Sequence, residues 1–443
     1  MTEELTSRVV DSLIIETALR LADQETVRTS VQQTHRYANY PTAWESSSLA
    51  MGPLGNAILF LTIYGSDIDS PCDWKKVAEE LLESCVEDTV ENSTKSDSLF
   101  GGAGGVLLAY VLAAGYDSKW RSIAKMIAEG LANQVLALDP VPDEGNLSDS
   151  DYDMINGRAG TLIAISIASR QFSESETIRA AQNRLFDDID ELLCRGKALA
   201  DTMWIHPVHY PHEDYIKQFP SGYFNMGLAH GLPGLLVALA NTNVAGYRDK
   251  QRRYLIEGLA DVILELALDD GFGLAWSSGY SRDDWQVDGI SVLTQSVPNA
   301  WCYGAPGVAV SLFRAGRAIG NKRLIQSART AMWGALDRTV GTRALDSMSP
   351  TFCHGLSGIL ACSISVLGRS ALNNSSSAQY KIAANLLSMA NKNYPLLFQD
   401  FEEPDRPLDN PTVLQGSAGI ALTLTLIRGN RRVPSWLNLF GLE

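Results

Sequence analysis

The sequence lacks any long hydrophobic run and any export signal. Its most apolar stretches, such as Gly104 to Ala114, are about ten residues long, whereas a membrane-spanning helix needs about 20 apolar residues. The start, Met1 to Ile15, has no basic segment followed by an apolar stretch and a cleavage site. We therefore expect a cytoplasmic protein without a membrane span.

Cysteines and basic residues are also scarce. Six cysteines in 443 residues, without an export signal, favour free thiols or metal ligands over a disulfide framework. Lys and Arg total 36 against 51 Asp and Glu, a net charge of −15. A chain this acidic repels phosphate backbones, so nucleic acid is excluded as the main partner, whereas cationic peptides would be attracted.

Known nucleotide-binding and hydrolase motifs are absent as well. The sequence contains no Walker loop, no Rossmann fingerprint and no Gly-x-Ser-x-Gly elbow. Hydrophobic residues make up 45% of the chain and charged residues 20%, which is the globular range. The length allows two or three average domains, or one large closed architecture.

One short pattern recurs seven times: Gly-x-x-Gly followed directly by an apolar run. Successive copies start between 50 and 74 residues apart. Recurrence at a period of this size indicates a repeat architecture. The copies begin at Gly52, Gly102, Gly157, Gly231, Gly304, Gly355 and Gly416.

Each repeat is predicted to hold two helices. The run after each motif is apolar on most faces, as in Val106–Ala113, which indicates a buried helix. Between these runs lie amphipathic stretches whose apolar residues recur at three and four. Examples are residues 73–90, 119–138, 252–268, 323–340 and 379–393.

We predict an all-α fold, an α,α-toroid with a double ring of seven inner and seven outer helices in a single domain over residues 1–443. An open superhelical stack is the competing arrangement. Closure is favoured because the inner helices carry almost no charge, whereas an open stack would expose one face of them to water. Two longer intervals, near 201–225 and 270–300, lack helical periodicity and predict loops or small β excursions on one rim. By composition the run Gly145 to Asp153 is an ordinary polar connector.

Cys302, Cys353 and His354 each lie one or two residues before a motif glycine. If equivalent repeat positions converge on one rim, two Cys and one His form a three-ligand set with one open position, which is typical of a catalytic zinc. The alternative is that they are small buried residues beside glycine turns, as we expect for Cys194 and Cys362.

His230 occupies the repeat position equivalent to His354 and is a candidate acid/base. Asp153, four residues before Gly157, could orient it or the substrate. Tyr303 follows a predicted ligand and could hydrogen-bond at the site. The alternatives are a hydrogen-bonded His at a helix start, a solvated or capping Asp and a Tyr that only packs.

Two further clusters are less persuasive. His206, His209 and His212 suggest a second metal, but Pro207 and Pro211 prevent one helical face from presenting all three. The acidic run 187–191 is similar to the magnesium motif of terpene cyclases. On a charged outer helix, we instead expect a solvated face.

Three blocks resemble the signatures of the LanC family, the lanthipeptide (lantibiotic) synthetase cyclases. They are Asn225-Met-Gly-Leu-Ala-His-Gly231, Trp301-Cys-Tyr-Gly304 and Cys353-His-Gly355. The resemblance covers nearly the whole chain, because the seven motifs match that family's seven-fold toroid. It implies one catalytic zinc ion held by Cys302, Cys353 and His354, and a site lined by His230, Tyr303 and Asp153.

The resemblance also implies an activity: addition of peptide Cys thiolates to dehydroalanine or dehydrobutyrine, which closes lanthionine or methyllanthionine rings. The partners would be a dehydrated precursor with leader and core, and the dehydratase and ABC transporter of the same pathway. Through such a synthetase complex the protein would lie at the inner face of the membrane. In length it is similar to the stand-alone cyclases of class I systems. Pro298 departs from the family, many of whose members carry Arg there.

Three alternatives remain on similar scaffolds. Protein prenyltransferase β subunits also activate a thiol with zinc on a toroid, but with a carboxylate ligand and a basic diphosphate cluster. LanC-like relatives suggest a peptide- or glutathione-binding role. A glycoside hydrolase toroid needs paired inward carboxylates, and the predicted inner helices offer almost none.

Overall fold

The computed structural model describes residues 7–37, 44–45, 48–85, 96–210, 212–285, 297–342, 345, 347–402, 406–429 and 435–443. The chain divides into two compact units. Unit 1 comprises residues 1–96, 100–124 and 336–443, and unit 2 comprises residues 97–99 and 125–335. The single-domain organisation over residues 1–443 stays a prediction.

A helix begins directly after the first glycine of each of the seven motifs, as the repeat predicts. In α6, every residue from Ala103 to Ala113 is buried, because an apolar helix gains free energy only when all of its faces leave water. We call these the motif helices. They are α3 (Pro53–Tyr64), α6 (Ala103–Tyr116), α8 (Arg158–Gln171), α11 (Leu232–Asn241), α14 (Ala305–Ile319), α16 (Leu356–Leu367) and α18 (Ser417–Arg428).

Amphipathic flanking helices alternate with the motif helices. In α4 the buried residues are Trp74, Ala78, Leu81 and Leu82, a stripe at the helical period. Asp73 caps this helix by accepting a hydrogen bond from the Lys76 amide, at 3.1 Å. The flanking helices are α4 (Trp74–Ser84), α7 (Arg121–Leu136), α9 (Glu176–Cys194), α12 (Tyr247–Glu265), α15 (Lys322–Gly341), α17 (Ala378–Ser388) and α1 (Ser7–Ala22), which is followed by α2 (Gln24–Tyr37).

The flanking helix of the last repeat comes from the opposite end of the sequence. In unit 1, α1 packs against α18, and Arg428 pairs with Asp11 at 2.8 Å. The segment η7 (Trp436–Phe440) packs against α6 in the same unit. The sequence motifs, which all precede their helices, gave no sign that α1 completes a repeat.

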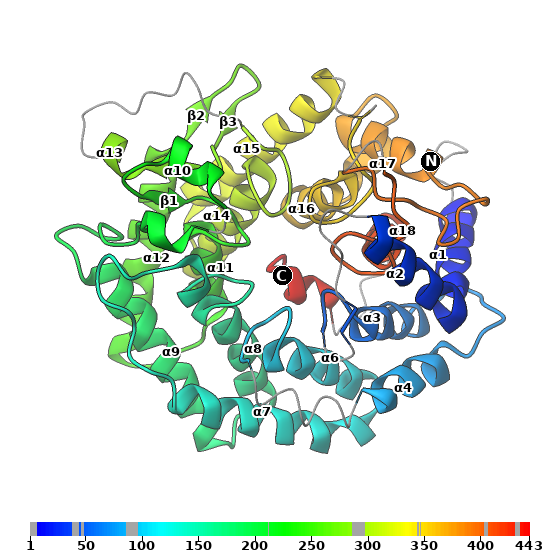
Figure 1. The fold of residues 1–443 in the computed structure, drawn as a ribbon, viewed down its shortest axis with the longest axis horizontal. Coiled ribbons are helices and arrows are strands. Elements are labelled where there is room, and N and C mark those ends of the chain that lie inside the picture. The colour runs from blue at the N-terminus through cyan, green and yellow to red at the C-terminus, as the bar shows by residue number, and fades with distance from the viewer. Residues whose placement is uncertain are drawn as a thin grey trace. The chain divides into compact units, whose positions relative to one another are not determined.

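Within each unit, successive hairpins pack side by side. In unit 2, α11 contacts both α8 and α14, while α9 packs on α8 and α12 packs on α11. In unit 1, α3 contacts α6 and α18, α18 contacts α16, and α4 and α17 pack on α3 and α16. Figure 1 shows the alternation of motif and flanking helices in each unit.

The motif glycines are required by close backbone contact. A Cβ atom on Gly231 would overlap the carbonyl oxygen of Asn225, and one on Gly234 would approach that of Leu228 to 2.6 Å. In both cases the carbonyl belongs to the residue six positions earlier. The same relation recurs at Gly304, Gly307, Gly355, Gly416 and Gly419.

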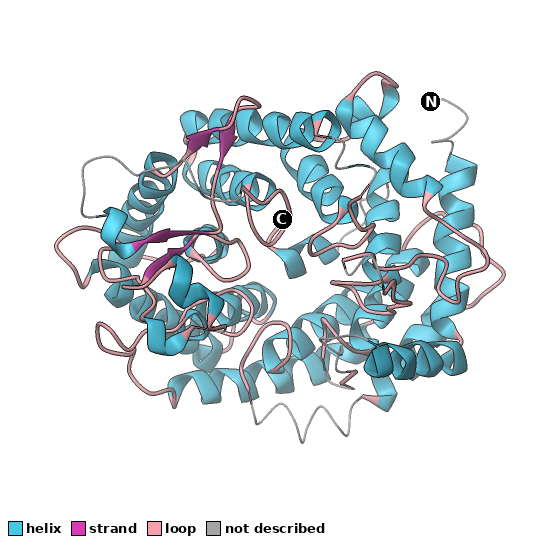
Figure 2. Cartoon of the chain, turned by 45° about the horizontal axis from the view of Figure 1, so that its top comes forward, coloured by secondary structure: helices cyan, strands magenta, loops and turns pink. Residues whose placement is uncertain are grey.

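The two long intervals of unit 2 meet in a short antiparallel pair. Strand β1 from the first interval pairs with β4 from the second, with Phe224 opposite Tyr280, so they form one excursion rather than two. Figure 2 shows both strand pairs. Residues 286–296 of the second interval lie outside the described part. The excursion contains η4 (Pro207–His209), α10 (Asp214–Gln218), β1 (Tyr223–Asn225), β2 (Leu268–Asp269), β3 (Leu274–Ala275), β4 (Gly279–Ser281) and α13 (Arg282–Trp285).

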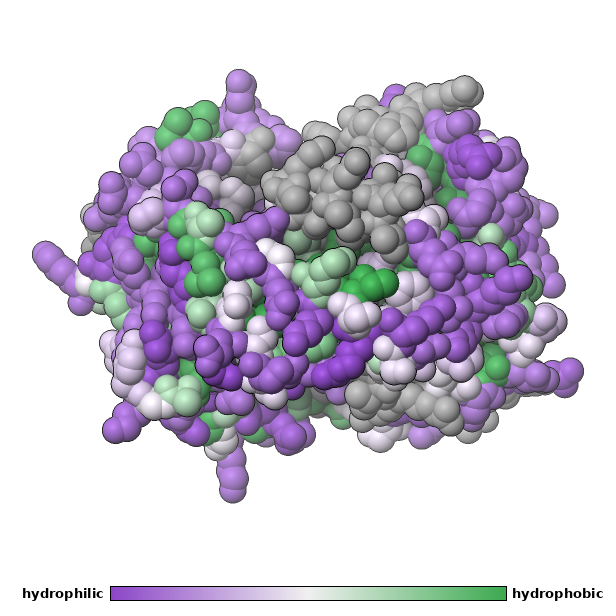
Figure 3. All heavy atoms as spheres, turned by 90° about the horizontal axis from the view of Figure 1, so that it is seen from below, coloured by the Kyte–Doolittle hydropathy of each residue, from purple (hydrophilic) through white to green (hydrophobic). Residues whose placement is uncertain are grey.

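The described surface is largely polar. On the face in Figure 3, hydrophilic residues predominate and hydrophobic ones form small separate patches. Among the described helices, none combines the length and hydrophobicity that crossing a membrane requires. All six cysteines are free thiols. We predicted that Cys194 is buried, but it is exposed.

Substituting Gly419 by Ala is expected to destabilise unit 1 by about 1–3 kcal/mol, because the new methyl group meets the Val413 carbonyl and the backbone must shift. Gly130 in α7 is the matched control. Nothing lies within 4 Å of a Cβ placed there, so Gly130→Ala should gain up to about 1 kcal/mol of helix propensity. Urea unfolding of both variants measures the difference. Equal stability of Gly419→Ala and the wild type would contradict the close-packing account.

Candidate active site

In unit 2, backbone hydrogen bonds join the loops that carry the predicted site residues. The Leu99 amide donates to the Ile155 carbonyl at 3.1 Å, and the Met154 amide donates to Ala229 at 3.1 Å. The Ala229 amide in turn donates to Cys302 at 3.3 Å. Each bond links one motif loop to the next. Cys302 belongs to this ladder, and Asp153 and His230 directly adjoin its members Met154 and Ala229.

Unit 1 repeats the arrangement. The Ala50 amide donates to the Phe100 carbonyl at 3.2 Å, and the Cys353 amide donates to the Leu414 carbonyl at 2.8 Å. The predicted convergence of equivalent loop positions is therefore seen between neighbouring repeats within each unit.

Asp153 and His230 form a close pair. Asp153 is fully buried, and its Oδ2 lies 2.5 Å from His230 Nδ1. Its Oδ1 accepts from the amides of Asn156 at 2.6 Å and Gly157 at 2.8 Å. These amides lie at the start of α8, where the helix dipole also favours a carboxylate. Because Nδ1 is held by Asp153, the exchange of a proton with a substrate would take place at Nε2 of His230, whose side chain is 33% exposed.

Tyr303 lies beside this pair. Its ring centroid is 6.4 Å from that of His230, and its hydroxyl accepts a hydrogen bond from Asn225 Nδ2 at 3.2 Å. Burial raises the pKa of Tyr303 well above its usual value, so the phenol stays neutral and can donate. Cys302, the preceding residue, is buried.

Sequence reasoning missed two residues near this pair. The run Gly145 to Asp153 is no ordinary connector, because it forms the short helix η3 (Asp149–Asp151), closed by a capping box with Ser148. Burial raises the pKa of Asp149, whose charge also interacts with His230 and Asp153. Tyr152 is completely buried, and its hydroxyl has no hydrogen-bond partner among the described residues. The sequence signal that could have indicated Asp149 and Tyr152 is their closeness to Asp153.

In unit 1, Cys353 and His354 present adjacent donor atoms. Cys353 Sγ lies 3.5 Å from His354 Nε2, and His354 Nδ1 lies 2.9 Å from Glu402 Oε2. With bond lengths of about 2.3 Å to sulfur and about 2.0 Å to nitrogen, two ligands of one tetrahedral zinc ion lie roughly 3.6 Å apart. Burial alone lowers the pKa of His354, but hydrogen bonds to Cys353 and Glu402 raise it, to about 11 overall.

Glu402 is a third residue that the sequence did not reveal. Its Oε1 accepts from the Thr351 hydroxyl at 3.3 Å, and its amide donates to Asp400 Oδ1 at 2.9 Å. Burial raises the pKa of Asp400 to about 6. Glu402 lies in the loop before the seventh motif, far from His354 in sequence, and no regular spacing connects them.

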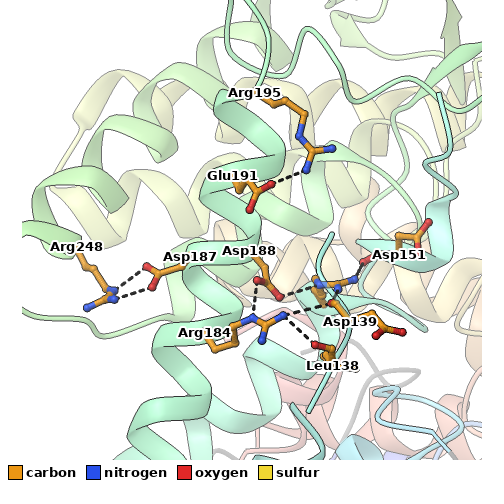
Figure 4. Close-up of polar contacts among 10 residues, drawn as sticks. Leu138, Asp139, Asp151, Arg184, Asp187, Asp188, Glu191, Arg195 and Arg248 are labelled. Carbon is orange, nitrogen blue, oxygen red and sulfur yellow. Dashed lines mark hydrogen bonds and ion pairs between the residues drawn. The ribbon is translucent and has the colours of Figure 1, made fainter. Parts of the chain in front are cut away.

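The structure also tests the predictions for the three histidines and for the acidic run 187–191. Among the described residues, His206, His209 and His212 do not converge as a metal-binding group, and His206 Nδ1 instead accepts from the Val208 amide at 3.3 Å. The prediction that the acidic run on α9 is a solvated face fits Asp187 and Glu191, whose side chains are 42% and 59% exposed. It is wrong for Asp188, whose side chain is 8% exposed and pairs with two arginines. Figure 4 shows this cluster.

Pro298 lies directly against the fifth motif. Its carbonyl oxygen occupies the space that a Cβ atom on Gly304 would need, and Gly304 has a φ of +97°. Nothing in the structure explains why proline stands where many relatives have arginine.

Comparisons with known proteins agree with this architecture. The family model for lanthionine synthetase C-like protein matches residues 43–438. The nisin biosynthesis protein NisC of Lactococcus lactis subsp. lactis is 23% identical over 293 residues, which cover 66% of this chain and 67% of that protein. The solved structure of nisin cyclase matches with a TM-score of 0.70 and 18% identity, over 95% of this chain and 97% of that one. This likeness shows the fold, an all-α α,α-toroid, as the sequence predicts.

Proposed function

Because the chain belongs to the lanthionine synthetase C-like family, we propose that it is a zinc-dependent cyclase of dehydrated lanthipeptide precursors. It adds peptide Cys thiolates to dehydroalanine or dehydrobutyrine and so closes lanthionine and methyllanthionine rings. The observation that carries the proposal is the Asp153–His230 pair, at 2.5 Å, on a loop hydrogen-bonded to the predicted ligand Cys302. The Asp153–His230 pair thus supplies an acid/base group beside Cys302, a predicted metal ligand.

Cys302, Cys353 and His354 would hold one zinc ion. Two thiols and an imidazole suit zinc, and the spacing of Cys353 Sγ and His354 Nε2 fits two of its ligands. Glu402 at Nδ1 would fix the orientation and tautomer of His354, as carboxylates do for zinc-bound histidines. When bound, zinc lowers the pKa of a coordinating thiol from about 8.5, so that the thiolate is available at neutral pH.

The ring-closing step needs one proton. The substrate thiolate forms a bond from sulfur to the β-carbon of the dehydro residue, and the π electrons move toward the α-carbon and its carbonyl oxygen. His230 Nε2 delivers the proton to the α-carbon, while Asp153 holds Nδ1. The Tyr303 hydroxyl, which accepts from Asn225, can donate a hydrogen bond to the substrate carbonyl oxygen and stabilise the negative charge that develops there.

Family membership supports the remaining assignments. The substrate would be a precursor with a leader and a dehydrated core, supplied by a dehydratase and passed to an ABC transporter. The location predicted from the sequence, cytoplasmic or at the inner face of the membrane within a synthetase complex, stays a prediction. To separate a cyclase from a peptide- or glutathione-binding protein, a dehydrated precursor is incubated with the protein and the remaining thiols are alkylated. A cyclase protects them through ring closure, whereas a binder leaves them reactive.

Replacing Cys353 by Ala should remove both bound zinc and ring closure, because one of three protein ligands is lost. Metal content is measured by elemental analysis and cyclisation by the alkylation assay. Cys194→Ala is the control, because Cys194 is exposed and outside the proposed ligand set. Full zinc content and full cyclisation in Cys353→Ala would refute the assignment.

His230→Asn should retain zinc and lose roughly 10²- to 10⁴-fold in cyclisation rate, because the proton donor is absent. The rate is followed by mass spectrometry of thiol-alkylated product, and metal content is checked in the same sample. His206→Asn is the matched control on the excursion, and its rate should equal that of the wild type. A His230→Asn rate close to wild type would assign the proton transfer to another group.

Glu402→Gln should weaken zinc binding about 10- to 100-fold, because the neutral amide no longer orients His354 through a charged acceptor. Competition with a chromophoric chelator measures the affinity without any cyclisation assay. Glu80→Gln, on the exposed side of α4, controls for the loss of one negative charge. If both variants bind zinc as the wild type does, Glu402 has no such role.

A further inference from the structure

The acidic run on α9 includes one buried carboxylate, that of Asp188. Asp188 accepts from Arg158 Nε at 3.0 Å through Oδ2 and from Arg184 Nε at 2.8 Å through Oδ1. Its side chain is 8% exposed and that of Arg158 is 11% exposed. A buried carboxylate needs such paired charges to offset its desolvation. We call Arg158, Arg184 and Asp188 the arginine clamp (Figure 4).

The same two guanidinium groups also hold a backbone segment. Arg158 donates through Nη1 to the Asp151 carbonyl at 3.1 Å and through Nη2 to the Asp139 carbonyl at 2.9 Å. Arg184 Nη2 donates to the carbonyls of Leu138 at 3.0 Å and Asp139 at 3.3 Å. Asp188 therefore orients both guanidinium groups, and these hydrogen-bond to the two ends of segment 138–151.

Arg158 is unusual for its position in the repeat. It is the first residue of α8, where a cation opposes the helix dipole. In the other six motifs this position holds an uncharged residue: Pro53, Ala103, Leu232, Ala305, Leu356 and Ser417. A largely buried cation at a helix N-terminus is unfavourable by itself, so its presence indicates a role particular to the third repeat.

Segment 138–151 leads directly into the candidate site. Asp151 closes the capping box with Ser148, and the Asp149 carbonyl accepts from the amides of Tyr152 at 3.1 Å and Asp153 at 2.8 Å. Asp153 therefore follows the clamped Asp151 by two residues, in a turn that leaves it little freedom.

We propose that the arginine clamp is a positioning device for Asp153 and, through it, for His230. The clamp touches no reacting atom. It fixes the backbone from which Asp153 reaches His230 Nδ1, and its catalytic meaning rests on the proposed cyclase function. Its neighbour Asp187 pairs with Arg248 on α12, at 2.6 and 2.7 Å.

The test compares Asp188→Asn with Asp187→Asn in the full-length zinc-loaded protein. Both remove one charge from adjacent positions on α9. The amides of Asn156 and Gly157, which donate to Asp153, report on the carboxylate directly through hydrogen exchange. We expect exchange roughly tenfold faster in Asp188→Asn, together with a kcat lower by up to about 100-fold, an almost unchanged KM and full zinc content. Asp187→Asn should match the wild type in all four.

Arg158→Lys provides a second variant that keeps the charge but cannot form the three-way fork. It should show the same faster exchange. Wild-type exchange at Asn156 and Gly157 in both clamp variants, or equal acceleration in Asp187→Asn, would overturn the proposal. Because exchange is measured without substrate, it tests the clamp even if the wild type closes no rings, an outcome that would overturn the cyclase function alone.

Discussion

The contact on which the rest of the structure depends is the one between a motif glycine and the carbonyl oxygen six residues earlier. It folds the loops before α11, α14, α16 and α18 back onto the starts of their own helices, and no larger residue fits. The folded-back loops then reach their neighbours, as when the Ala229 amide meets the Cys302 carbonyl. Within each unit, side chains from repeats far apart in sequence are brought next to one another by backbone geometry before any side-chain chemistry is considered.

This arrangement places chemistry at helix N-termini. Asp153 accepts from amides at the start of α8, and Cys353 lies three residues before Leu356, the first residue of α16. The positive ends of helix dipoles favour anionic groups, such as carboxylates and metal-bound thiolates. Buried motif helices thus serve both as the core and as an electrostatic support for the proposed site. Two histidines, His230 and His354, are each held at Nδ1 by a carboxylate, Asp153 and Glu402 respectively.

Much of this could be read from the sequence because it repeats. Seven glycine motifs fixed the starts of seven helices, and the register between copies singled out His230 and His354. The residues that were missed have no counterpart in the repeat. Glu402 reaches His354 from a distant loop. Asp188 pairs with Arg184 on its own helix and also with Arg158 on α8, a partner that only the packing of the two helices brings to it. Composition describes the acidic run correctly as charged, but the identity of its partners depends on packing.

The pairing of α1 with α18 has a consequence for biosynthesis. Asp11 leaves the ribosome more than 400 residues before its partner Arg428, so α1 can meet α2 and α3 early but lacks its main native neighbour, α18, during most of translation. Contacts this distant in sequence close slowly, since a large loop entropy must be overcome first. Early helices can assemble hairpin by hairpin with their neighbours, but completion of unit 1 must wait for the end of synthesis. Until then, the apolar face of α1 is incompletely covered and is open to recognition by chaperones.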